Sequence, residues 1–161
     1  SIEDYMHMID LKTGHMIGLA AEIGAISAAA DASTIQSLRD YGRLIGRAFQ
    51  IQDDYFEIFS NTKTMGKSLQ SDIILGKKTF LMIKAIDINE KFIKELNQLL
   101  KLDFYKALEK LQKFMINEGI RDAAVLEIDD LLSLANKKIS SLNIDVKKIL
   151  YFSNLINERG N

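Results

Sequence analysis

Three acidic residues lie close together about a third of the way along the chain: Asp53, Asp54 and Glu57. If this segment is helical, Asp53 and Glu57 are one turn apart, and Gln50 lies one turn before Asp53. Crowded carboxylates repel one another and stay ionised most easily beside a cation or in open water. Mg²⁺ prefers oxygen ligands, usually one or two protein carboxylates completed by waters and substrate phosphates. The acidic strip therefore favours a magnesium site, and a solvated helix face is the alternative.

Two glycines and a second acidic pair bear on that choice. Gly42 and Gly46 fall on the same strip of the expected helix, and they indicate space for a ligand beside the acids. Asp129 and Asp130 lie in a similar leucine-rich stretch that has no glycine strip beside it. We interpret that second pair as surface residues.

A basic segment follows the acids. Residues 61–78 are polar and contain Lys63, Lys67, Lys77 and Lys78. Ammonium groups bind phosphate oxygens, so an acidic strip followed by such a segment suits a metal–diphosphate complex, with a solvated loop as the alternative. Residues 61–68 imitate a phosphate-binding P-loop, but Asn61 stands in place of the first glycine and no strand precedes it, so we reject that interpretation.

Two other polar features carry weaker signals. Lys12-Thr13-Gly14 is expected between two helices. Taken alone, this segment is explained by a lysine that interacts with the dipole at the end of the first helix and a glycine that ends that helix. His7 and His15 have no metal-ligand spacing with each other or with acids, and we interpret them as ordinary helix residues.

The elements that must position these residues are expected to be helices. The chain contains no proline, and apolar residues recur at helical spacing. We expect a loop at 61–78, and a broad buried apolar arc on residues 38–59. The predicted fold class is all-α, a bundle of long helices. Start and stop signals predict helices over residues 2–12, 14–30, 34–60, 79–86, 89–100, 104–117, 121–142 and 146–157.

Composition sets outer limits on function. The 161 residues suit one domain, and 21 basic against 22 acidic residues give no net field that would favour nucleic acid or an anionic membrane. The absence of cysteine excludes disulfides and thiolate metal sites and fits a cytoplasmic protein. No apolar run approaches the ~20 residues that a transmembrane helix needs.

Several motifs together resemble one family. Residues 49–57, Phe-Gln-Ile-Gln-Asp-Asp-Tyr-Phe-Glu, are similar to the second aspartate-rich motif of the trans-isoprenyl diphosphate synthases, or polyprenyl synthetases. Gly66-Lys67, Asp72 and the segment 76–79 follow at the family's spacing. Lys12-Thr13-Gly14 matches the motif that precedes the long helix, and residues 152–159 resemble the family's C-terminal end. The resemblance implies that residues 1–161 form the C-terminal half of a single isoprenoid-synthase-type helical domain, with the N-terminal part of the fold missing.

The resemblance also implies a function in isoprenoid biosynthesis. The expected enzyme is a prenyltransferase that condenses isopentenyl diphosphate head-to-tail with an allylic diphosphate, typically as a homodimer. Magnesium ions would be bound by Asp53, Asp54 and Glu57. The allylic diphosphate would be bound by Lys12, Lys67 and Lys77, with Phe49 and Gln50 also in the substrate site. The catalytic groups facing the allylic cation would be Lys12, Thr13 and Gln50.

The sequence departs from the family pattern at three points. Glu57 replaces the last aspartate of the motif, and Leu81 stands where the family often has proline. The first aspartate-rich motif and the basic residues that bind isopentenyl diphosphate are absent from this chain, so we expect little or no turnover from it alone. Three alternatives stay open: a non-catalytic subunit of a heteromeric synthase, a helical interaction domain that binds no diphosphate and, as the least favoured, a terpene cyclase.

Overall fold

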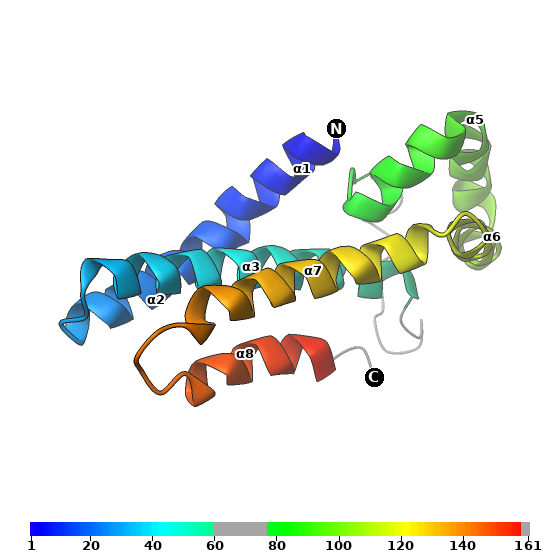
Figure 1. Ribbon diagram of the computed structural model, residues 1–161. Coiled ribbons are helices and arrows are strands. Elements are labelled where there is room, and N and C mark those ends of the chain that lie inside the picture. Colours follow the sequence, from blue (N-terminus) through cyan, green and yellow to red (C-terminus); the bar gives the residue numbers. More distant parts are fainter. Residues whose placement is uncertain (60–76, 159–161) are drawn as a thin grey trace. The chain divides into compact units, whose positions relative to one another are not determined.

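The computed structural model describes residues 1–59 and 77–158, and every regular element in these two stretches is a helix (Figure 1). The predicted all-α fold class is confirmed. The chain separates into two compact units. Unit 1 combines residues 1–5 with 53–125, and unit 2 combines residues 6–52 with 126–161, as far as they are described. The assignment of residues 1–161 to one domain stays a prediction. Along the described residues, no helix is both long enough and apolar enough to cross a membrane.

The helices follow the predicted order. From residue 32 onward their ends lie within a few residues of the predicted ones, and helices α1, α3 and α7 contribute to both units. The predicted loop 61–78 lies almost entirely outside the described residues. The elements are α1 (Ile2–Ile9), the π-helical turn η1 (Asp10–Gly14), α2 (His15–Ser27), α3 (Ala32–Phe59), α5 (Phe80–Leu102), α6 (Phe104–Asn117), α7 (Ile120–Ser140) and α8 (Lys147–Glu158).

The predicted helix break at Lys12–Gly14 is wrong. The chain stays helical from Ile2 to Ser27, because α1 passes into α2 through η1. Within η1 the hydrogen-bonding step is longer than in an α-helix: the backbone N–H of His15 donates to the carbonyl oxygen of Asp10, five residues earlier. Gly14 has α-helical dihedral angles, so it does not end a helix here.

In unit 2, glycines let η1 and α2 approach α3 until their backbones touch. A Cβ atom added at Gly46 would lie 2.6 Å from the Cα of Gly14, and one at Gly42 would lie 2.8 Å from the Cα of Gly18. Real Cβ atoms essentially never come that close to another heavy atom. The prediction that Gly42 and Gly46 leave space for a ligand is therefore wrong, since the backbone of η1 and α2 fills it.

The opposite side of α3 packs against α7 and α8, which run alongside it in unit 2 (Figure 1). The hydroxyl of Tyr41 donates to the carbonyl of Ile149 at 2.6 Å and lies 3.0 Å from the Ser153 hydroxyl. On this side the predicted apolar arc of α3 is confirmed at Leu38, Tyr41, Ile45, Ala48 and Ile51, which are all buried. Asp129 and Asp130 of α7 are exposed, as predicted.

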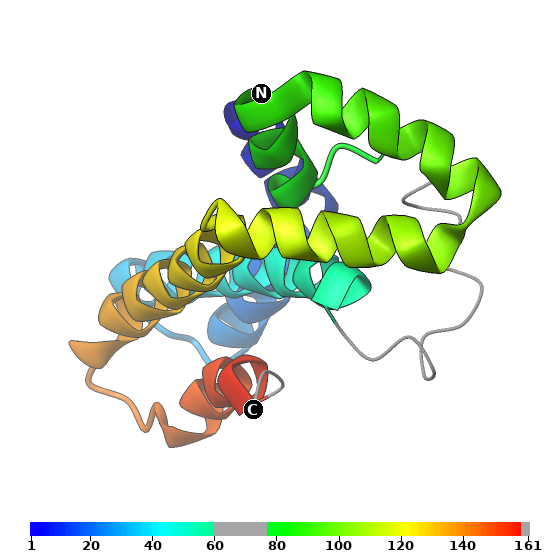
Figure 2. The same cartoon turned by 90° about the vertical axis from the view of Figure 1, so that its right-hand side faces the viewer.

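Unit 1 is built around α5 and α6. Thr79 begins α5 by accepting a hydrogen bond from the backbone N–H of Met82. Leu81, one residue into the helix, is fully buried, in line with the continuous helix expected at that position. The helix bends at Asn89, whose backbone is non-helical and whose side chain accepts a hydrogen bond from the Phe92 N–H. α5 therefore consists of two helical segments that meet at Asn89, in agreement with the two predicted helices 79–86 and 89–100. Figure 2 shows the bend and α6 running back beside the second half of α5, where the rings of Phe92 and Phe114 stack.

The glycine contacts give a direct test of this packing. Gly46→Ala should lower the free energy of unfolding by about 1–3 kcal/mol, because the added methyl group would meet backbone that cannot turn aside. Gly24→Ala is the matched control, since a Cβ there meets nothing within 4 Å. That control should raise stability by about 0.4–1 kcal/mol, as alanine favours the helix. Urea unfolding of both variants measures the difference, and equal effects would contradict the close approach.

Candidate functional site

The three acids of the predicted metal site differ in their surroundings. All lie on the last turns of α3, within unit 1. Asp53 and Glu57, one helical turn apart, are half-buried. Asp54 is rotated away from that strip and is only 5% exposed. Among the described residues, no group of three or more His, Cys, Asp or Glu side chains is arranged to hold a metal ion.

Asp54 is held by a tyrosine that the sequence did not single out. The hydroxyl of Tyr5, on α1, donates a hydrogen bond to Oδ2 of Asp54 at 2.5 Å. Burial and the neighbouring Asp54 carboxylate both raise the pKa of Tyr5, so its hydroxyl stays protonated and remains a donor. The Tyr5 ring also packs near Phe80, at the start of α5. This contact fixes the first residues of α1 to the acidic end of α3.

One predicted basic residue lies near the acids. The ammonium nitrogen of Lys77 is 3.9 Å from Oε1 of Glu57, and the lysine side chain is half exposed. Lys78 is exposed as well. Lys67, together with Lys63 and Asp72, lies outside the described residues. Unit 1 therefore brings a lysine and a glutamate of the predicted site together.

The acidic turn fits a magnesium ion of the kind that binds substrate phosphates. Mg²⁺ commonly takes one or two carboxylates from the protein and completes its octahedron with waters and phosphate oxygens. Asp53 and Glu57 can provide two such oxygens from one helix face, since both side chains are partly exposed. Asp54 already accepts the Tyr5 hydrogen bond and is enclosed.

In unit 2, the turn η1 places two of the predicted catalytic residues. The hydroxyl of Thr13 donates to Oε1 of Gln50, on α3, at 3.1 Å. Lys12 is exposed, and Phe49, beside Gln50, is half-buried. The structure therefore joins Thr13 and Gln50 directly, and their catalytic role stays a prediction. His7 and His15 are exposed helix residues, as expected.

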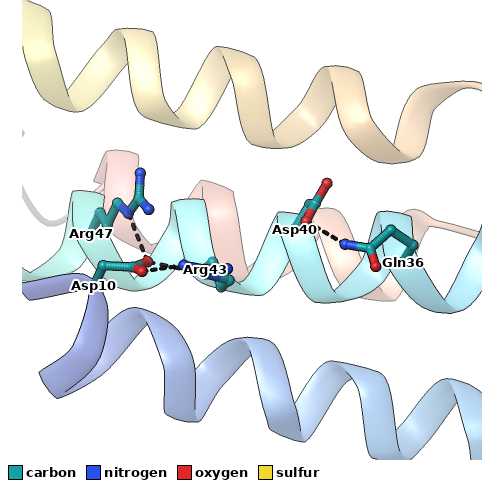
Figure 3. Close-up of polar contacts among 5 residues, drawn as sticks. All are labelled: Asp10, Gln36, Asp40, Arg43 and Arg47. Atoms are coloured by element: carbon teal, nitrogen blue, oxygen red, sulfur yellow. Dashed lines mark hydrogen bonds and ion pairs between the residues drawn. The ribbon is translucent and has the colours of Figure 1, made fainter. Parts of the chain in front are cut away.

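An ion cluster beneath this turn was missed by sequence reasoning. Asp10, the first residue of η1, is buried and accepts hydrogen bonds from two arginines one turn apart on α3 (Figure 3). Arg43 uses Nε, 3.2 Å from Oδ1, and Nη2, which bonds Oδ2. Arg47 donates from Nε to Oδ1 at 2.8 Å. The available signal was an acidic residue two positions before Lys12 and a pair of arginines four residues apart, but only the fold brings them together.

Electrostatics explain why a buried carboxylate is tolerated at this position. Burial by itself would raise the pKa of Asp10, because it penalises the charged form. Hydrogen bonds from Arg43 and Arg47 outweigh that effect and lower the pKa from 3.8 to about 2. Asp10 is therefore ionised at neutral pH, and both of its carboxylate oxygens have arginine partners.

Comparison with known proteins places this all-helical chain in a family. The sequence pattern of the polyprenyl synthetases matches residues 1–117. The short chain isoprenyl diphosphate synthase of Methanothermobacter thermautotrophicus is 45% identical over 85 residues, which are 53% of this chain and 26% of that protein. The enzyme of the same name from Methanocaldococcus jannaschii is 31% identical over 132 residues, 82% of this chain and 36% of that protein.

Solved structures agree with the sequence relatives. A geranylgeranyl pyrophosphate synthase, 31% identical, superposes with a TM-score of 0.83 over 97% of this chain and 51% of its own. The heptaprenyl diphosphate synthase of Staphylococcus aureus, 28% identical, superposes with a TM-score of 0.84 over 100% of this chain and 51% of its own. The chain belongs to the polyprenyl synthetase family. It spans about half the length of these solved structures, and a quarter to a third of the sequence relatives is aligned with it.

The Tyr5–Asp54 bond predicts a stability effect at the acidic turn. Tyr5→Phe keeps the ring but leaves the enclosed Asp54 carboxylate with one donor fewer, so the free energy of unfolding should fall by about 1–3 kcal/mol. Tyr105→Phe, at a side chain that is 70% exposed, is the control and should change it little. Denaturant unfolding measures both, and equal losses would show that the Tyr5 hydroxyl has no special role.

The Asp10 cluster predicts a specific pH dependence. Because the folded-state pKa lies below the ordinary value, this contribution is complete above pH 3.8 and disappears as the pH falls toward 2. Wild type should exceed Asp10→Asn by about 2 kcal/mol in unfolding free energy at pH 6. This difference in unfolding free energy should decrease steadily between pH 4 and pH 2 in a urea-unfolding series. A gap that does not change with pH would mean that the charge of Asp10 contributes nothing.

Proposed function

We propose that this chain supplies the magnesium- and diphosphate-binding part of a cytoplasmic prenyltransferase that joins isopentenyl diphosphate to an allylic diphosphate. The observation that carries the proposal is the acidic turn of α3. In a chain of the polyprenyl synthetase family, Asp53 and Glu57 remain partly exposed one turn apart, with the Lys77 ammonium 3.9 Å from Glu57. Carboxylates beside a lysine are the groups that a metal–diphosphate complex requires.

The proposed reaction begins when the bond between the allylic carbon and the diphosphate oxygen breaks. Negative charge then grows on the leaving diphosphate, and groups that are already in place stabilise that charge more than the starting ester. Lys12, Lys67 and Lys77 are the proposed partners of its oxygens. Asp53 and Glu57 would hold Mg²⁺, which supplies further positive charge to the leaving group. Asp54 belongs to the same aspartate-rich motif, and we propose that its hydrogen bond with Tyr5 orients the acidic turn of α3.

Positive charge develops on the allylic fragment at the same time, and electron-rich oxygens would stabilise it. Thr13 and Gln50 are suited to that role because their hydrogen bond fixes both side chains in one arrangement. The backbone carbonyl of Lys12 would act with them. The new carbon–carbon bond then forms to isopentenyl diphosphate, and the released diphosphate accepts the proton lost at the end. We propose that the complete enzyme is a homodimer and that this chain alone turns over little or no substrate.

Metal-dependent binding of inorganic diphosphate tests the first part of the proposal. Calorimetric titration should show binding to the wild-type chain with Mg²⁺ and far weaker binding without it. Asp53→Ala should weaken binding by about tenfold or more, because it removes a proposed metal ligand. Asp129→Ala, in the exposed acidic pair of α7, is the matched control and should bind like wild type. Metal-independent or absent binding would favour a helical interaction domain instead.

Turnover tests the reaction itself. The chain alone, and the chain fused to the upstream part of its Methanothermobacter relative, would be supplied with Mg²⁺, isopentenyl diphosphate and allylic diphosphates of several lengths. Mass spectrometry should find a prenyl product from the fusion, none after Asp53→Ala, and little from the chain alone. A folded fusion that makes no product from any partner would point to a non-catalytic subunit.

A further inference from the structure

The turn η1 needs a source of stability, because π-helical turns are rare and commonly occur at functional sites. A backbone hydrogen bond from the His15 N–H to the Asp10 carbonyl oxygen closes the turn. Asp10 therefore anchors the turn through its main chain. A further attachment is needed to hold η1, with Lys12 and Thr13, against α3.

The side chain of Asp10 provides that attachment. Its carboxylate is 5% exposed and reaches two guanidinium groups on successive turns of α3. Arg43 meets both carboxylate oxygens with a two-pronged contact, and Arg47 adds a third hydrogen bond. Such charge-assisted contacts are short and directional, so they fix a position as well as adding energy. Figure 3 shows the carboxylate of Asp10 directed at both arginines.

Close packing leaves the carboxylate little freedom to move. A Cβ atom on Gly14 would lie 2.9 Å from Oδ1 of Asp10 and 3.0 Å from the Arg43 carbonyl oxygen. Gly14 in turn touches Gly46 across the helix contact. Aspartate and glycine therefore occupy one tight space, and the arginines cover it from the α3 side.

The same turn makes a second polar attachment three residues later. Thr13 donates to Gln50 at 3.1 Å, so Asp10 and Thr13 hold η1 to α3 at its beginning and near its end. The partners Arg43, Arg47 and Gln50 follow one another along α3 at spacings of four and three residues, which places them on one helix face. Lys12 lies between the two attachments.

We propose that Asp10 is a positioning residue that holds η1 in its π-helical form and so sets the orientation of Lys12, the residue of this turn that would meet a diphosphate ligand. The ligand part of this inference rests on the proposed function. Asp10 itself does not touch the ligand, because its carboxylate is enclosed and both of its oxygens are bonded to Arg43 and Arg47. An ordinary stabilising ion pair would raise the stability of the whole unit equally. A positioning residue would mainly affect the local stability of this turn and the affinity for the ligand, with a smaller effect on the remainder of the unit.

Two variants and one control separate these cases. Asp10→Asn removes the charge, and Arg47→Gln removes one donor while leaving the Arg43 contact, so it serves if the first variant does not fold. Asp40→Asn is the control, because Asp40 lies on α3 like the two arginines but pairs with Lys138 of α7 instead of with Asp10 or its turn. Hydrogen exchange of the backbone amides of residues 12–15, followed by NMR in the intact chain, reports the turn directly. Amides of α8 report whole-unit opening.

Asp10→Asn should speed exchange at residues 12–15 by about tenfold or more relative to α8, and should weaken magnesium-dependent diphosphate binding by about tenfold. Arg47→Gln should give smaller changes of the same kind, and Asp40→Asn none. Unchanged exchange at the turn, or acceleration equal to that of α8, would overturn the inference. So would a loosened turn with unchanged diphosphate affinity. Failure of wild type to bind diphosphate would overturn the proposed function, and exchange at the turn would still decide whether Asp10 holds it.

Discussion

Unit 2 depends on the approach of two helices to backbone contact. Gly14 faces Gly46, and Gly18 faces Gly42, so no side chain separates η1 and α2 from α3. At that distance dispersion contacts between backbones replace side-chain packing, and polar groups on either helix come within hydrogen-bonding range. The Thr13–Gln50 bond and the Asp10 cluster both form across this contact. A larger residue at any of the four positions would separate the groups that the proposed chemistry needs.

The contact also explains why a charged group can be buried there. An isolated carboxylate in such tight surroundings would be strongly destabilising, and it would remain ionised only with compensating partners. Asp10 has three hydrogen bonds from arginines whose outer surfaces still reach solvent. The arginines therefore keep part of their hydration while neutralising the buried charge. This division between an enclosed anion and half-exposed cations limits the desolvation penalty.

Sequence reasoning predicted the helices well because helical periodicity, proline absence and turn glycines are local signals. It predicted the buried arc of α3 for the same reason. It failed at Gly14, Gly42 and Gly46. A glycine can end a helix, leave room for a ligand or allow close contact with another helix, and only the position of the neighbouring helix decides which of these applies. It also missed Tyr5 and Asp10, since their partners lie 49 and 33 residues away in the sequence. The differing environments of Asp53 and Asp54 likewise depend on which helix covers them.

The π-helical turn has a consequence for how this part of the chain can change in evolution. A single π turn contains one residue more than the α-helical turn it replaces. Deleting one residue between Asp10 and Thr13 would restore a regular helix and leave α2 facing nearly the same direction. Asp10 and Thr13 would then be two residues apart, about 200° around the helix, so they could no longer both face α3. Insertions and deletions should therefore be excluded from this segment even where substitutions are accepted, so its length is constrained more tightly than its sequence.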